Sequence, residues 1–139
     1  MQPKRSQFTI DSLDKLADVR TFIRESAVEL GADPEKTKDL ILAVNEATTN
    51  IFIHGFDRAS CNVEISVETI DHAVFVTILD DGPPFDPTQA PLPDTTVPLD
   101  KRRPGGLGIL MMVEYSDQLI YTRTAENQNQ LVFKAILKT

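Results

Sequence analysis

Glu46 and Asn50 are the first pair of residues whose types and spacing could support catalysis. They lie four residues apart in the segment 45–55 (NEATTNIFIHG), within a predicted helix, so both side chains belong to one helical face. A carboxylate beside a carboxamide can orient a proton acceptor and hold a hydrated magnesium ion. The same spacing also fits a solvated pair on an amphipathic helix. His54 alone fits a helix-end residue that bonds a carbonyl better than it fits a catalytic base.

A second polar group follows a predicted buried strand, where Asp80 and Asp81 precede Gly82 and two prolines. A carboxylate at the floor of a pocket accepts hydrogen bonds from an amino group such as the exocyclic amine of adenine. Gly82 would let a flat base approach the backbone, because glycine has no Cβ. The alternative is an acidic turn, since Asp-Gly-Pro sequences form turns readily.

Clustered glycines form the third motif, Gly105-Gly106-Leu107-Gly108, directly after Arg103 and Pro104. Glycines at a helix N-terminus expose backbone N–H groups to an anion, and the helix dipole assists. No Lys-Ser/Thr follows, which excludes a Walker A motif, and no strand directly precedes it, as a dinucleotide fingerprint requires. A hinge with a glycine-rich turn is the alternative.

Two predicted helices carry or flank the first motif. The first begins after a cap at Asp11 or Ser12 and stops at Gly31; Asp33 caps the second, with Pro34 at its first position, and this helix runs to about residue 53. Their apolar stripes consist of Leu13, Leu16, Val19, Ile23, Ala27 and Leu30, and of Leu40, Val44, Ala47 and Ile51.

Alternating polarity predicts strands over 7–10, 61–68, 73–79, 118–124 and 131–137, with a polar turn at 126–129 and a short helix at 109–115. The stretch from Asp80 to Pro104 holds seven of the nine prolines, which rules out a regular element across it. We therefore expect an α+β two-layer sandwich, with a mainly antiparallel sheet and helices on one face. Residues 1–139 are expected to form a single domain.

Composition narrows the function classes. The 139 residues suit one domain, and the net charge of −7 argues against direct nucleic-acid binding, which needs a basic face. One cysteine excludes an internal disulfide, and no run approaches the length of a membrane span. No signal-peptide pattern is present, so the expected location is the cytoplasm, without membrane attachment.

In their order and placement, the three motifs resemble the N box and the two glycine boxes of the GHKL ATPase superfamily, which has the Bergerat fold. Within it, the chain looks like the anti-sigma-factor serine/threonine kinases of bacterial partner-switching systems. The resemblance covers nearly the whole chain. One departure is Pro84, which stands where the first glycine box usually has its second glycine. Proline fixes φ and removes a donor, so backbone adjustment is lost at that point.

The resemblance implies ATP and Mg²⁺ as cofactors and a role for each motif residue. Asn50 would coordinate the magnesium ion and contact the nucleotide, Glu46 would accept the proton of a protein serine or threonine, and Asp80 would bind the adenine amine. The remaining nucleotide-binding residues would be Gly82, Arg103, Gly105, Gly106, Leu107 and Gly108. Residues 83–104 would form a lid that closes over the nucleotide.

By the same resemblance, the protein substrate is a small anti-anti-sigma (STAS) protein and the alternative ligand is a sigma factor held inactive. A homodimer is also implied, because such kinases commonly pair through their sheets. Two further interpretations stay open: a nucleotide-binding regulator without kinase activity, and a purely protein-binding regulator that does not respond to nucleotide. The intact Glu46/Asn50 pair favours an enzyme.

Overall fold

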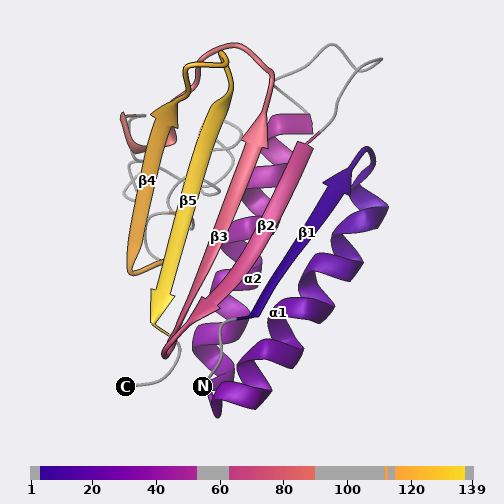
Figure 1. Cartoon of the computed structure of the whole chain (residues 1–139), viewed down its shortest axis with the longest axis vertical. Helices are drawn as coiled ribbons and strands as arrows, with labels where there is room; N and C mark the ends of the chain where they lie inside the picture. Colours follow the sequence, from indigo (N-terminus) through magenta and orange to yellow (C-terminus); the bar gives the residue numbers. More distant parts are fainter. Residues whose placement is uncertain (1–3, 53–62, 90–111, 113–114, 137–139) are drawn as a thin grey trace, which may run out of the picture.

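The computed structural model describes residues 4–52, 63–89, 112 and 115–136. Its strands and helices are β1 (Lys4–Ile10), α1 (Leu16–Leu30), α2 (Pro34–Asn50), β2 (Val63–Ile70), β3 (Ala73–Asp80), β4 (Gln118–Arg123) and β5 (Asn129–Ile136). The five strands form one antiparallel sheet in the order β1-β2-β3-β5-β4, and both helices cover the same face of it (Figure 1). The predicted α+β two-layer architecture is confirmed.

The start of α1 differs from the prediction. A 3₁₀ turn, η1 (Leu13–Lys15), precedes the helix, and the side chain of Ser12 makes no capping hydrogen bond. Asp11 instead pairs with Lys15, its Oδ1 lying 2.8 Å from Nζ, and this hydrogen bond holds the pKa of Asp11 below its ordinary value. Ser12, one of the two predicted caps, therefore occupies the N-cap position of η1 and not of α1, and its side chain does not cap the turn. Leu13 lies 40% exposed because the tighter turn moves it off the helical stripe.

The junction between the helices follows the prediction. Gly31 ends α1 in the left-handed region, with φ 68°, and a side chain with a Cβ is disfavoured there. Asp33 caps α2, since its Oδ1 accepts a hydrogen bond from Glu35 N at 3.0 Å, and Pro34 occupies the first position. Asn50 ends α2, and residues 51–52 continue as a π-helical turn. Neither helix combines the length and apolarity needed to cross a membrane among the residues described.

The core lies between the helices and the covered face of the sheet. Alternate residues of each strand point into it, so the period-two patterns identified the correct face. Each fully buried aliphatic side chain contributes about 1.5–3 kcal/mol. The strand residues of this core include Val63, Ile65, Val67, Val74, Val76, Ile78, Leu131 and Phe133, and the helices supply Val19, Ile23, Leu40 and Val44.

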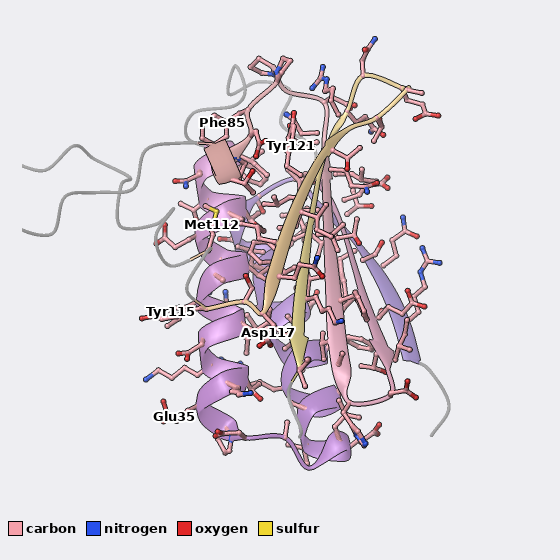
Figure 2. All side chains as sticks on the ribbon, turned by 90° about the vertical axis from the view of Figure 1, so that its left-hand side faces the viewer. Glu35, Phe85, Met112, Tyr115, Asp117 and Tyr121 are labelled. Carbon is pink, nitrogen blue, oxygen red and sulfur yellow. The ribbon has the colours of Figure 1, made fainter. Side chains whose placement is uncertain are left out.

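The first turn of α2 is tied to the end of β5. Lys36 Nζ donates to the carbonyl of Ile136 at 3.3 Å, and Asp117 Oδ2 accepts from the Ile136 N–H at 2.6 Å. A cleft of about 150 Å³ lies there, bordered also by Asp39 and Tyr115. Figure 2 shows Tyr115 and Asp117 beside α2, between Glu35 and Met112. The Lys36 contact joins the first turn of α2 to the end of β5.

Several boundaries differ from the sequence-based ranges. β2 continues two residues past the predicted end, to Ile70, and β5 begins at Asn129, which the pattern assigned to a polar turn. Within the described part of the proline-rich stretch, residues 80–89, a 3₁₀ turn, η3 (Pro87–Gln89), packs against β4. Asp86 Oδ1 accepts the Thr88 N–H at 2.9 Å and caps this turn. The predicted helix at 109–115 lies mostly outside the described residues, although Met112 is buried in the core.

Candidate functional site

Asp80 ends the central strand of the sheet. In the strand registers it faces Val63 of β2 and Asn129 of β5. The residue is only 5% exposed, although aspartate is rarely buried unless it has partners. Here a non-local sheet position, rather than a surface turn, determines where the carboxylate lies.

The turn after β3 is built around the Asp80 carboxylate. Gly82 N donates to Asp80 Oδ1 at 2.9 Å, which closes a local Asx-type turn. Gly82 itself is buried, while Asp81 between them is exposed and accepts from Gln128 Nε2 at 3.0 Å. The predicted pair Asp80 and Gly82 is therefore brought together in one small polar site.

Asn129 is the principal residue that sequence reasoning missed. It is 7% exposed, and its Nδ2 donates to Asp80 Oδ1 at 3.0 Å and to the carbonyl of Pro83 at 2.9 Å. On its other side, Oδ1 accepts from Phe85 N at 3.4 Å. One amide thus contacts both the carboxylate and the loop that follows it. The only signal in the sequence was a polar residue at the edge of a predicted strand.

Two residues of β4 complete this network. Arg123 Nη1 donates to the Gly82 carbonyl at 2.8 Å and to Asn129 Oδ1 at 3.2 Å, and the Tyr121 hydroxyl also donates to Asn129 Oδ1. Arg123 faces Asn129 in the β4–β5 register. Both side chains are partly buried, so the hydrogen bonds are shielded from water and strengthened. Neither residue belongs to a sequence motif.

Glu46 and Asn50 lie in the last turns of α2, and both side chains are partly exposed. Ala43 and Ala47 beside them are buried, so the pair lies at the edge of the buried stripe, as predicted. Figure 1 shows that α2 and β3 end at the same end of the molecule, which brings the helix pair and Asp80 to one side. Figure 2 shows Phe85 and Tyr121 at this end and Glu35 at the other.

The glycine-rich motif falls outside the described residues. This applies to Arg103, Gly105, Gly106, Leu107 and Gly108, to most of the predicted lid at 83–104, and to His54. Among the residues that are described, no three His, Cys, Asp or Glu side chains form a metal-binding group.

Comparison with known sequences gives a family for the chain. The pattern of the histidine kinase-like ATPase domain matches residues 11–135. An anti-sigma F factor of Clostridium novyi (strain NT) is 33% identical over 113 residues, which are 80% of this chain and 78% of that protein. The anti-sigma F factor of Bacillus licheniformis is 30% identical over 117 residues, 81% of this chain and 77% of that protein.

Two further proteins are similar to the chain, one in sequence and one in fold. The serine/threonine-protein kinase BtrW of Bordetella bronchiseptica is 33% identical over 85 residues, 60% of each chain. A crystal structure of the RsbU and RsbW domains of a Mycobacterium tuberculosis protein has a similar fold, with a TM-score of 0.61 at 17% identity. That match covers 99% of this chain, which spans about a third (32%) of the larger solved chain.

Proposed function

The chain belongs to the histidine kinase-like ATPase domain family, and on this basis we propose that it is an ATP-dependent serine/threonine protein kinase that acts as an anti-sigma factor. It phosphorylates an anti-anti-sigma protein of the STAS type and, as the alternative, sequesters a sigma factor. The relatives named anti-sigma F factor and serine/threonine-protein kinase support this proposal. The protein then works in the cytoplasm, as one domain with a lid at about residues 83–104.

The buried carboxylate of Asp80 is the observation that carries the proposal. Its Oδ1 already accepts from Gly82 N and Asn129 Nδ2. A carboxylate has two acceptor oxygens, so Oδ2 is the atom suited to the exocyclic amine of adenine. Gly82 carries no side chain that would keep a base from this edge of the turn. The chemistry of these residues therefore fits an adenine nucleotide.

Asn50 and Glu46 supply the two other requirements of phosphoryl transfer. The Asn50 carboxamide oxygen is a hard ligand of the kind that Mg²⁺ takes together with phosphate oxygens. Glu46, one helical turn earlier, accepts the proton of the substrate hydroxyl. When bound, ATP supplies the phosphoryl group, and Mg²⁺ neutralises charge on the phosphates. Arg103 and the residues Gly105–Gly108 would hold the phosphates, an assignment that rests on the sequence motif.

Charge explains how transfer could switch partners. A phosphate adds about −1.5 to −2 charges to the antagonist at neutral pH. The chain itself carries a formal charge of −7. Repulsion would weaken the complex with the phosphorylated antagonist and leave the chain available for the sigma factor.

Transfer of a radiolabelled γ-phosphate from ATP to a STAS-type protein of the same organism tests the proposal. Glu46→Gln should bind ATP and transfer no label. Glu35→Gln is the matched control, since Glu35 lies exposed at the opposite end of the same helix. Equal transfer by the wild type and Glu46→Gln would contradict the role of Glu46 as proton acceptor. No transfer by the wild type would contradict the proposed kinase activity.

A thermal-shift experiment separates the remaining alternatives. ATP at 100 times its dissociation constant stabilises a protein by about 2.7 kcal/mol. Stabilisation without phosphoryl transfer would indicate a nucleotide-binding regulator, and no response to ATP, with or without Mg²⁺, would indicate a purely protein-binding module. Light scattering coupled to size exclusion tests the homodimer, which would pair through the sheet face that α1 and α2 leave open.

A further inference from the structure

We infer that Asn129 is a positioning residue that makes the proposed nucleotide site select adenine. It does so by holding the Asp80 carboxylate and the loop Gly82–Phe85 in place before any nucleotide arrives. The inference rests on the proposed function, because the selectivity concerns the same site. Asn129 acts through Asp80 and the loop, without a role in the transfer step.

The surroundings of Asn129 allow one orientation of its amide. Nδ2 faces three acceptors: Asp80 Oδ1 at 3.0 Å, the Pro83 carbonyl at 2.9 Å and the Gly82 carbonyl at 3.4 Å. Oδ1 faces three donors: Phe85 N, the Tyr121 hydroxyl and Arg123 Nη1. A flipped amide would oppose acceptor to acceptor at Asp80 and the two carbonyls, and donor to donor at Phe85 N and Arg123 Nη1; only the Tyr121 hydroxyl could adapt, because it can also accept. The network therefore fixes the Asn129 side chain, and with it the Asp80 carboxylate and the loop Gly82–Phe85.

The loop after β3 depends on these side chains for its shape. Pro83 and Pro84 have no N–H, so this stretch cannot form a normal backbone hydrogen-bond ladder. Asn129 holds the loop on both sides of Pro84, through the Pro83 carbonyl and the Phe85 N–H. Arg123 holds the Gly82 carbonyl at 2.8 Å. The loop is thus fixed by cross-strand side chains at the position where Pro84 prevents backbone adjustment.

The same contacts determine which atom Asp80 presents. Asn129 Nδ2 and Gly82 N both bind Oδ1, so the carboxylate cannot rotate without breaking buried hydrogen bonds. Oδ2 is then held as an acceptor for an amine. Guanine places a carbonyl where adenine has its amine, and two acceptors would be opposed. Without Asn129 the carboxylate could turn or admit water, and this discrimination would fall.

Calorimetry with ATP and with GTP tests the selectivity. Asn129→Ala should weaken ATP binding by about tenfold or more, because a buried partner of Asp80 is lost, while GTP binding changes little. The ATP-to-GTP affinity ratio should therefore fall. Asn127→Gly is the matched control: it removes an amide two residues away in the exposed turn, where φ is 59°, and should keep the ratio.

Tyr121→Phe provides a milder variant in case Asn129→Ala does not fold. It removes only one donor to Asn129 Oδ1 and should lower the ratio in the same direction by a smaller factor. A ratio that stays at the wild-type value in both folded variants would overturn the inference. A purely structural role would lower the affinity for both nucleotides equally and would overturn it too.

The hydrogen bonds by which Asn129 holds Asp80 and the loop Gly82–Phe85 are called the clamp here. Amide hydrogen exchange without nucleotide tests this clamp independently of the proposed function. In the wild type the Phe85 and Gly82 amides should be protected, since they donate to Asn129 and Asp80. In Asn129→Ala the Phe85 amide should exchange about tenfold faster or more, with the core strands unchanged. Unprotected amides in the wild type would overturn the inference. Failure of the wild type to bind ATP, with these amides protected, would overturn the proposed function and the selectivity but leave the clamp intact.

Discussion

Asp80 and Asn129 face each other across β3 and β5, and the Asn129 amide donates to the Asp80 carboxylate at 3.0 Å. The two residues are 49 positions apart in the chain, and both are buried. One ends its strand and the other begins its strand, so the contact lies where the sheet meets the loop Gly82–Phe85. The candidate site therefore depends on sheet register as much as on motif residues.

Asp80→Asn should reverse part of the base preference. The amide can donate to the guanine carbonyl but opposes the adenine amine with one of its own donors, so ATP binding should weaken by about 1–3 kcal/mol. Calorimetry with both nucleotides measures this. Asp81→Asn is the matched control, because Asp81 is exposed and contacts Gln128 instead. Equal losses in the two variants would mean that Asp80 does not face the base.

Asn50→Ala and Glu46→Gln should fail at different steps. A metal ligand contributes to nucleotide binding, so Asn50→Ala should lose the magnesium-dependent part of ATP affinity. A proton acceptor contributes only in the transition state, so Glu46→Gln should keep the affinity and lose kcat. Binding and single-turnover transfer should be measured on the same preparations. Wild-type transfer rates in both variants would rule out the assigned roles.

Gly31→Ala should destabilise the fold by about 1–2 kcal/mol, because an L-residue with a Cβ is strained in the left-handed region. Gly31 has φ 68° and its N–H donates to the Val28 carbonyl at 3.0 Å. Gly31→Asn should lose less, since asparagine tolerates this conformation better. Urea denaturation gives both values. If Gly31→Ala were as stable as the wild type, the left-handed conformation at this position would not require glycine.

Asn45→Ala should stabilise the protein by about 0.5–2 kcal/mol, from better helix propensity and removal of an unsatisfied acceptor. Asn45 lies in α2, and its Oδ1 is buried without a hydrogen-bond partner among the described residues. Asn45→Asp keeps the oxygen and adds a charge, so it should destabilise. Loss of stability in Asn45→Ala would show that the amide has a partner of its own, such as a bound water.

Local signals in the sequence predicted most of the fold. The Asp33 cap, Pro34 and the Gly31 stop act within a few residues, and the structure has each where the pattern placed it. The buried faces of the helices and strands were also predicted correctly, because periodicities of 3.6 and 2 directly reflect which side chains contact the core. The position of Asp80 at the end of a buried strand was also predicted correctly. The prediction that Leu13 belongs to the apolar stripe of the first helix was wrong, because one 3₁₀ turn changes the angular spacing of the residues before α1.

The hydrogen-bonding partners of Asp80 could not be predicted in the same way. Asn129 lies among the polar residues 126–129, and nothing local distinguishes the one that enters the strand. Its role arises from the pairing of β5 with β3, a contact between distant parts of the chain. Arg123 and Tyr121 reach it from β4 through the β4–β5 register. Such positions become visible only once the strand order is known.

The position of β5 between β3 and β4 also has a consequence for biosynthesis. A chain emerging from the ribosome can pair β2 with β3 early, because the turn at residues 71–72 joins these two strands. The strand between β3 and β4 arrives only with residues 129–136, and pairings at such sequence separation form slowly. Until then the Asp80 carboxylate lacks its Asn129 partner. A nascent chain halted before Asn129 should therefore lack the proposed nucleotide site, and ATP should stabilise the chain only after β5 has been inserted.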